Sequence, residues 1–285
     1  YTSAEASRSM TVTLQQGAHS AQATVTINAV AAVTPAAAWR DLAVSTSRMV
    51  AVAADGSGEP GILISVDGGT TWTTSTSAPR GLPWSTVAIS ADGLTIVAAA
   101  AGSASASTQS GIAISRDGGA SWSLASAPVD AYTALALLDN GQILSADLAT
   151  LEQGRDTTGK LVWLNRPGNL RLSSTSPTAP NSWTALSVPN ANWRDLAADS
   201  AGRQLIAAAG SATNQAERAR LMVGTRGTDS SIVWTETTAG LPAAADWTAV
   251  ASSGDGRVLL AATRGGALYR ADTSAAGWSW QAVGP

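Results

Sequence analysis

One short pattern occurs twice in the chain and constrains its fold more than any other feature. Residues 65–72 read Ser-Val-Asp-Gly-Gly-Thr-Thr-Trp, and residues 115–122 read Ser-Arg-Asp-Gly-Gly-Ala-Ser-Trp. Each copy follows an apolar run, which predicts a strand that enters a tight turn. The glycines permit positive φ, and the Ser and Asp oxygens can accept hydrogen bonds from amides of their own turn. We expect the closing Trp to begin the next strand and to bury a large apolar face.

The pattern S-x-D-G-G-x-[ST]-W resembles the Asp-box, which is also called the bacterial neuraminidase repeat. The residues that carry the resemblance are Ser65, Asp67, Gly69, Trp72, Ser115, Asp117, Gly119 and Trp122. Asp-boxes occur in sialidases, xyloglucanases, sortilin-like receptors and photosystem II assembly factors. Because the box usually lies on the outer part of a propeller blade in these families, the resemblance implies a β-propeller and a structural role for these residues.

The eleven tryptophans of the chain indicate how many blades there are. One set of aromatic residues opens a short strand in each unit, and a second set closes the unit, with Asp-Gly or Asn-Gly turns and apolar runs in between. The units begin near Trp39, Trp84, Tyr132, Trp193 and Trp247. Their shared pattern resembles a repeat of secreted bacterial proteins over about residues 39–283. We therefore predict an all-β fold, a five-bladed β-propeller with four strands in each blade, arranged around a closed circle.

The N-terminal part does not share this repeat. Two alternating runs, 9–14 and 21–27, flank a polar segment and predict a β-hairpin. The hairpin could be the end of an immunoglobulin-like domain, pad the propeller, or pair with a partner. Because a lone two-stranded hairpin is only marginally stable, we expect it to dock onto something. The predicted domains are 1–38, the hairpin and linker, and 39–285, the propeller.

Composition excludes several classes of function. Charged residues make up 13% of the chain and the net charge is −3, which argues against nucleic acid as a partner. The absence of cysteine excludes disulfides and thiolate metal sites, and one histidine, His19, cannot build a histidine-based metal site. We predict no cofactor, no metal and no transmembrane segment. A chain of this composition fits a secreted, periplasmic or cell-surface bacterial protein.

Long segments between strands are the predicted binding regions, because irregular loops on a rigid scaffold often carry function. They fall at residues 101–110, 147–160 and 210–220, where the second strand of a blade leads to the third. Trp163 fits neither set of blade tryptophans and is the best candidate anchor for a protein or sugar partner. The candidate partner-binding residues are Glu152, Arg155, Asp156, Trp163, Arg166, Arg218 and Arg220.

Three functions compete. A non-catalytic binding or scaffold propeller is the favoured hypothesis, and an accessory subunit of a larger assembly is one form that it could take. A carbohydrate-binding, lectin-like module is the first alternative, and a sialidase-like glycoside hydrolase is the second. The resemblance to sialidases would imply an arginine triad and a Tyr–Glu pair, but the R-I-P signature is missing and only three tyrosines exist. We therefore predict that the chain is not an enzyme and has no catalytic residues.

Overall fold

The structure is a computed structural model of the chain. The residues that it describes are 8–16, 19–27, 37–53, 61–101, 111–128, 130–148, 150–155, 161–166, 168–211, 219–228, 230–243, 245–274 and 276–283.

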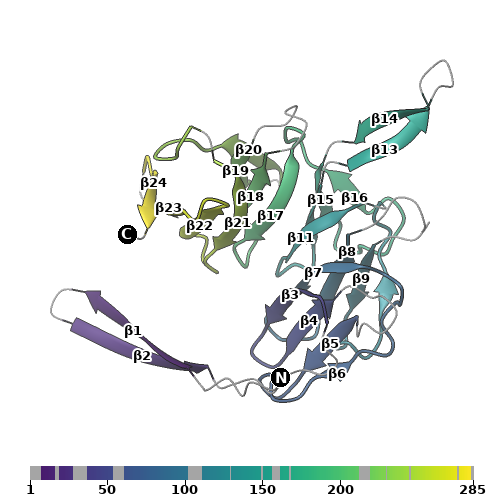
Figure 1. Cartoon of the computed structure of the whole chain (residues 1–285), viewed down its shortest axis with the longest axis horizontal. Coiled ribbons are helices and arrows are strands. Elements are labelled where there is room, and N and C mark those ends of the chain that lie inside the picture. The colour runs from purple at the N-terminus through teal and green to yellow at the C-terminus, as the bar shows by residue number, and fades with distance from the viewer. Residues whose placement is uncertain are drawn as a thin grey trace.

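The predicted five-bladed propeller is confirmed, because the chain forms five antiparallel sheets of four strands (Figure 1). The first blade contains β3 (Trp39–Val44), β4 (Met49–Ala53), β5 (Ile62–Ser65) and β6 (Thr73–Thr74). The second contains β7 (Trp84–Ile89), β8 (Ile96–Ala100), β9 (Ile112–Ser115) and β10 (Ser123–Leu124). The third contains β11 (Tyr132–Leu137), β12 (Ile143–Asp147), β15 (Leu170–Ser173) and β16 (Trp183–Ala185). The fourth contains β17 (Asn192–Ala198), β18 (Gln204–Gly210), β19 (Arg220–Arg226) and β20 (Ile232–Glu236), and the fifth contains β21 (Trp247–Ser252), β22 (Val258–Thr263), β23 (Leu268–Asp272) and β24 (Trp280–Val283).

Two hairpins stand outside the blades. The first joins β1 (Arg8–Gln16) to β2 (His19–Ile27), which agrees with the predicted N-terminal hairpin. The second joins β13 (Thr150–Arg155) to β14 (Leu161–Arg166) and is inserted between the second and third strands of the third blade. Figure 1 shows this second hairpin extending away from the blades.

The first strand of every blade has the same local geometry. A β-bulge interrupts pairing just after the opening aromatic residue, for example between Trp39 and Asp41 and between Trp193 and Asp195. A bulge bends the strand and increases its twist. From the fourth residue of the strand onward the pairing is regular again, so equivalent positions can be compared directly from blade to blade.

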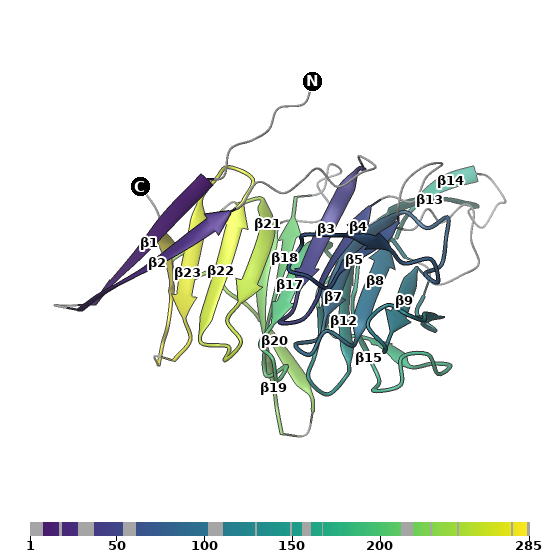
Figure 2. The same cartoon turned by 90° about the horizontal axis from the view of Figure 1, so that it is seen from below.

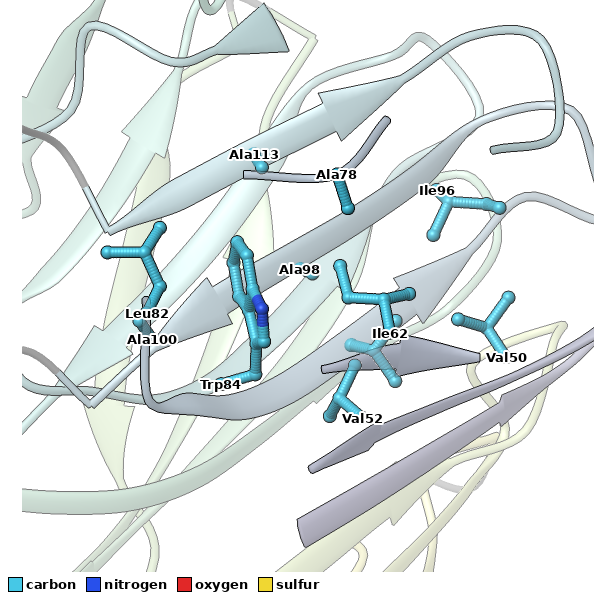
Figure 3. Close-up of a cluster of buried hydrophobic side chains, with 11 residues drawn as sticks. Val50, Val52, Ile62, Ala78, Leu82, Trp84, Ile96, Ala98, Ala100 and Ala113 are labelled. Carbon is cyan, nitrogen blue, oxygen red and sulfur yellow. The ribbon is translucent and has the colours of Figure 1, made fainter. Parts of the chain in front are cut away.

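The hydrophobic core is divided among the interfaces between successive blades. Figure 3 shows the first of these, where Trp84 of the second blade lies among Val52 and Ile62 of the first blade and Ala98 of its own. Because side chains alternate along a strand, each blade uses one face toward the preceding blade and the other toward the following blade. Four such interfaces connect the five blades.

The tryptophans that open the strands carry more of this core than those that close the boxes. Trp84, Trp193 and Trp247 are buried, whereas Trp72 and Trp122 are half-buried. The expectation that the closing Trp of each box buries a large apolar face is therefore met only in part. The box places its indole beside the turn, where one side of the ring stays open to solvent.

The blades follow one another in an arc, which Figure 2 shows from a second direction. The first strands pack in chain order, β3 on β7, β7 on β11, β11 on β17 and β17 on β21. Within the described part of the chain, no strand of the first blade makes comparable contact with a strand of the fifth. The expected closed circle is thus left open between these two blades.

Candidate functional site

The two segments that resemble Asp-boxes, 65–72 and 115–122, here called the boxes, form self-contained corners. In the first, Ser65 Oγ donates to Asp67 Oδ1 at 2.8 Å and accepts from the amide of Gly69 at 2.9 Å. Thr71 donates to the same carboxylate through its amide, at 2.9 Å, and its hydroxyl, at 2.6 Å. These bonds, led by the one from the Thr71 hydroxyl, lower the pKa of Asp67 to about 2.

The second box repeats this arrangement. Asp117 accepts from the amide of Ser121 at 2.8 Å and from the hydroxyls of Ser121 and Ser115. The hydroxyl of Ser121 is the largest cause of a pKa lowered to about 2. Both carboxylates are therefore occupied by their own turns, which is a structural use and leaves little acceptor capacity for a ligand.

The inserted hairpin gathers four of the predicted partner-binding residues. Glu152 and Arg155 lie on β13, while Trp163 and Arg166 lie on β14, with Trp163 opposite Gln153. The expectation of an irregular loop over 147–160 is wrong where the structure describes it, because residues 150–155 form a strand. Asp156 lies outside the described residues.

The remaining two candidates do not join this group. Arg220 begins β19 in the fourth blade, where it forms an ion pair with Glu236 at 3.9 Å. Arg218 lies outside the described residues. The described candidate residues therefore lie mainly on the inserted hairpin and not on one face shared by several loops.

A buried ion cluster lies at the base of this hairpin. Arg171 of β15 contacts Asp130 at 3.2 Å and Asp147, the last residue of β12, at 3.7 Å. Asp147 also accepts from the amide of Asn169 at 2.7 Å. Both aspartates are buried and the arginine side chain is 14% exposed. Such a cluster fixes geometry more than it adds stability, so it holds the two ends of the insertion in place.

The sequence did not point to two cavities among the described residues, which lie on the opposite side of the blades, at the turns between first and second strands. One cavity of about 580 Å³ is lined by turns of the second to fifth blades and includes Asp92, Asp139 and Asp199. An adjoining cavity of about 630 Å³ shares Asp139 and Asp199 and adds Asp255. Arg203 and Arg257 belong to its lining as well.

Three of these carboxylates, those of Asp92, Asp199 and Asp255, accept hydrogen bonds from their own turns. Asp92 accepts from the hydroxyl of Ser90 and from the amide of Leu94 at 2.9 Å, and the Ser90 bond is the first cause of its lowered pKa. Asp199 accepts from the amides of Arg203 at 2.6 Å and Gln204 at 2.8 Å. The recurrence of Asp or Asn before Gly between the first two strands of the second to fifth units was the sequence signal for these turns.

Two further aspartates bridge neighbouring blades. Asp41 accepts from the amide of Val87 at 2.9 Å, and Asp195 accepts from the amide of Val250 at 2.8 Å. Desolvation is the main cause of a pKa raised to about 6 for Asp195, and the charge of Asp41 adds to it. Because its oxygens bond to Val250 and to Leu196, this carboxyl serves the blade interface.

No model of a known protein family matches the sequence, and no protein of curated function matches it. Solved structures share its fold at low identity. An enzyme of family GH74 from Niastella koreensis is 14% identical, with a TM-score of 0.58 over 97% of this chain and 43% of the enzyme. The Cps50 (Swd1) β-propeller domain of Myceliophteria thermophila is 12% identical, with a TM-score of 0.56 over 87% of this chain and 73% of that one. Hydrazine synthase of Kuenenia stuttgartiensis is 13% identical, with a TM-score of 0.57 over 82% of this chain and 64% of that one.

These likenesses establish the propeller fold. The chain spans less than half the length of the GH74 enzyme, and the three neighbours include both enzymes and a propeller domain. In the described part of the structure, no helix is long and apolar enough to cross a membrane. Those same residues contain no group of three or more His, Asp or Glu side chains that could hold a metal ion.

Proposed function

We propose that the chain is a non-catalytic binding propeller of a secreted or periplasmic bacterial protein, and that the hairpin β13–β14 is its main contact with a protein partner. The observation that supports this most is the insertion itself. It belongs to no blade, it extends from the third blade, and it carries Glu152, Arg155, Trp163 and Arg166 on two paired strands.

The ion cluster of Asp130, Asp147 and Arg171 gives the insertion a fixed base. Association with a rigid element costs less conformational entropy than association that must first order a flexible loop. Tryptophan and arginine are also the residue types that most often dominate binding energy at protein interfaces. The insertion thus combines a rigid support with suitable contact residues.

The test compares variants of the full chain in affinity purification from the native cell envelope, followed by titration with the recovered partner. Trp163→Ala should weaken association at least tenfold, which corresponds to about 1.4 kcal/mol, without lowering the melting temperature. Val233→Ala, at an exposed position of β20, is the matched control and should bind normally. Equal affinities for the three proteins would disprove the role of the hairpin.

A carbohydrate-binding function is the second candidate, and the cavity with Asp92, Asp139 and Asp199 favours it. Its volume suits a small saccharide, and its serine hydroxyls can donate hydrogen bonds to sugar hydroxyls and accept them, while its aspartate carboxylates can accept them. A glycan array probed with the wild-type chain tests this candidate. Binding that Asp139→Asn abolishes would support it, and an array without hits would reject it.

The proposal of a non-catalytic role draws support from how two tyrosines are used. Tyr132 is fully buried and donates its hydroxyl to the carbonyl oxygen of Pro128. The Tyr269 ring packs edge-on against Trp247, with ring centroids 5.6 Å apart. Tyr1 lies outside the described residues. Both described tyrosines therefore serve packing, and turnover of a panel of fluorogenic glycosides would contradict the proposal.

A further inference from the structure

The first blade has an apolar, exposed face on the side directed away from the second blade. Trp39 is 40% exposed, and Leu42 and Val44 are each 56% exposed, although all three lie on the strand that begins a blade. The residues in the place of Trp39 in the other blades, Trp84, Tyr132, Trp193 and Trp247, are at most 4% exposed. In those blades the preceding blade covers this face. In the described part of the chain, no blade covers the face of Trp39, Leu42 and Val44, here called the leading face.

The fifth blade is not suited to cover the leading face. At the end of the arc, Arg270 of β23 pairs with Leu260, as Val223 of β19 pairs with Ile206 in the fourth blade. The equivalent residues in the first three blades are Ile64, Ile114 and Leu172. Four aliphatic side chains that face the following blade are thus replaced by an arginine, whose side chain is 44% exposed. Arg270 pairs with Asp272 at 3.4 Å, and burying this ion pair against Trp39, Leu42 and Val44 would remove both charges from water, which is costly.

The N-terminal hairpin has the opposite character. Its register pairs Met10 with Val25, Val12 with Ala23, and Leu14 with Ala21. Because residues of a strand alternate between its two faces, these six apolar residues share one face of the hairpin. Serine, threonine and glutamine occupy the intervening positions and share the other face. A two-stranded ribbon of this kind needs a surface to pack on for stability.

The chain connection favours this hairpin over any separate molecule. The ten peptide units from Ile27 to Ala37 can span at most about 35 Å, and Trp39 opens the leading face directly after them. A tether of that length gives an effective concentration of order mM, roughly 10²–10³ times above that of a second chain at µM concentration. Figure 1 shows the hairpin on the open side of the arc.

We propose that the hairpin β1–β2 docks its apolar face on the leading face of the first blade, over Trp39, Leu42 and Val44, and so caps the arc. Its polar face then meets solvent, as the outer face of a terminal capping repeat does in other repeat proteins. At the other end of the arc, the charged side chain of Arg270 is well solvated, so this face of the fifth blade can stay exposed without a cap. The two ends of the arc are therefore finished in different ways.

Cysteine trapping in the full chain tests this arrangement, since the native sequence contains no cysteine. In Val12→Cys/Leu42→Cys, a short bis-maleimide should link the two thiols within one chain, and intact mass with non-reducing electrophoresis would show a cross-linked monomer. Thr13→Cys/Leu42→Cys places the thiol on the polar face and should react at least tenfold more slowly. Equal rates for the two variants, or no cross-link in either, would overturn the proposal. A cross-linked dimer would overturn it in favour of a second copy as the occupant.

A second measurement does not depend on the geometry of a cross-link. The alkylation rate of Leu42→Cys reports how well this position is covered. Adding Val12→Asp should raise that rate several-fold because a carboxylate on the apolar face opposes docking, whereas adding Thr13→Asp should leave it unchanged. Circular dichroism of both variants checks that the blades remain folded. An alkylation rate that neither aspartate changes would overturn the proposal as well.

Discussion

The sequence Trp-Arg-Asp-Leu-Ala occurs twice in the chain, at residues 39–43 and 193–197, and begins a blade both times. In the first blade its Trp is 40% exposed and its Leu 56%, whereas in the fourth blade they are 0% and 4% exposed. Both copies form the same bulged strand. Identical residues with identical local structure thus differ only in whether another blade precedes them. Local sequence determines the strand here, and position in the arc determines what the strand buries.

The largest expected effect separates the two tryptophans. Trp193→Ala should lower the free energy of unfolding by about 3–5 kcal/mol, because a fully buried ring is lost and a cavity remains. Trp39→Ala should cost less, because the ring is 40% exposed on the first blade and a docked two-stranded hairpin covers it less fully than a four-stranded blade would. Urea denaturation of both variants measures the difference. Equal losses would mean that the leading face is buried as deeply as an internal blade interface.

This comparison also shows what the sequence could predict. Periodic aromatic residues and Asp-Gly turns were sufficient for the five blades and their strand order, because both depend on local signals repeated along the chain. The exposure of Trp39 depends on a neighbour that is absent, which no local pattern contains. The blade pattern has no place for a further strand between the second and third strands of a blade, so the sequence predicts a loop over 147–160, where the structure has β13. The clustering of Asp92, Asp139 and Asp199 required the arc itself, which brings equivalent turns together.

The second effect concerns the dependence of stability on pH. Burial raises the pKa of Asp195 to about 6, so the folded state holds a proton that the unfolded chain releases near pH 4. The contribution of this residue to the free energy of unfolding therefore decreases as pH rises from about 4 to 6, by about 3 kcal/mol in total. Asp195→Asn should remove this decrease, as measured by urea denaturation at several pH values.

The matched variant is Asp41→Asn, at the same position of the first blade. It removes a negative charge that contributes to the raised pKa of Asp195. The loss of unfolding free energy between pH 4 and 6 should therefore become smaller without disappearing. The boxes act in another range, since the lowered pKa values of Asp67 and Asp117 add stability above about pH 4 that is lost as pH falls toward 2. If Asp195→Asn leaves the slope between pH 4 and 6 intact, burial at the blade interface is not its cause.

The third effect compares one glycine in the two boxes. Gly69 and Gly119 have φ values of +88° and +94°, so alanine at either position incurs about 1–2 kcal/mol of backbone strain. A Cβ at Gly119 would lie 2.0 Å from Ile64 Cδ1 of the first blade, whereas one at Gly69 would meet only Met49 Sδ at 3.2 Å and Trp72 at 3.9 Å. Gly119→Ala should therefore cost about 1–2 kcal/mol more than Gly69→Ala in chemical denaturation. A cost at Gly69 as large as that at Gly119 would argue that the first blade is also covered on this side.

The smallest effect concerns single hydrogen bonds between blades. Thr133 donates toward the carbonyl oxygen of Ala146 in its own blade, at 3.3 Å, and toward that of Trp193 in the next blade, at 3.1 Å. Thr248 occupies the same position in the fifth blade, where it donates toward the carbonyl oxygen of Ala262 in that blade, at 3.3 Å. Thr133→Val should cost about 1 kcal/mol, because valine keeps the shape and removes the bond that links two blades. Thr248→Val should cost less, because among the described residues no blade follows the fifth and offers a second acceptor. A Thr248→Val variant as destabilised as Thr133→Val would indicate that something in solution packs on the fifth blade, and Arg270 would then have to meet an acidic or aromatic surface there.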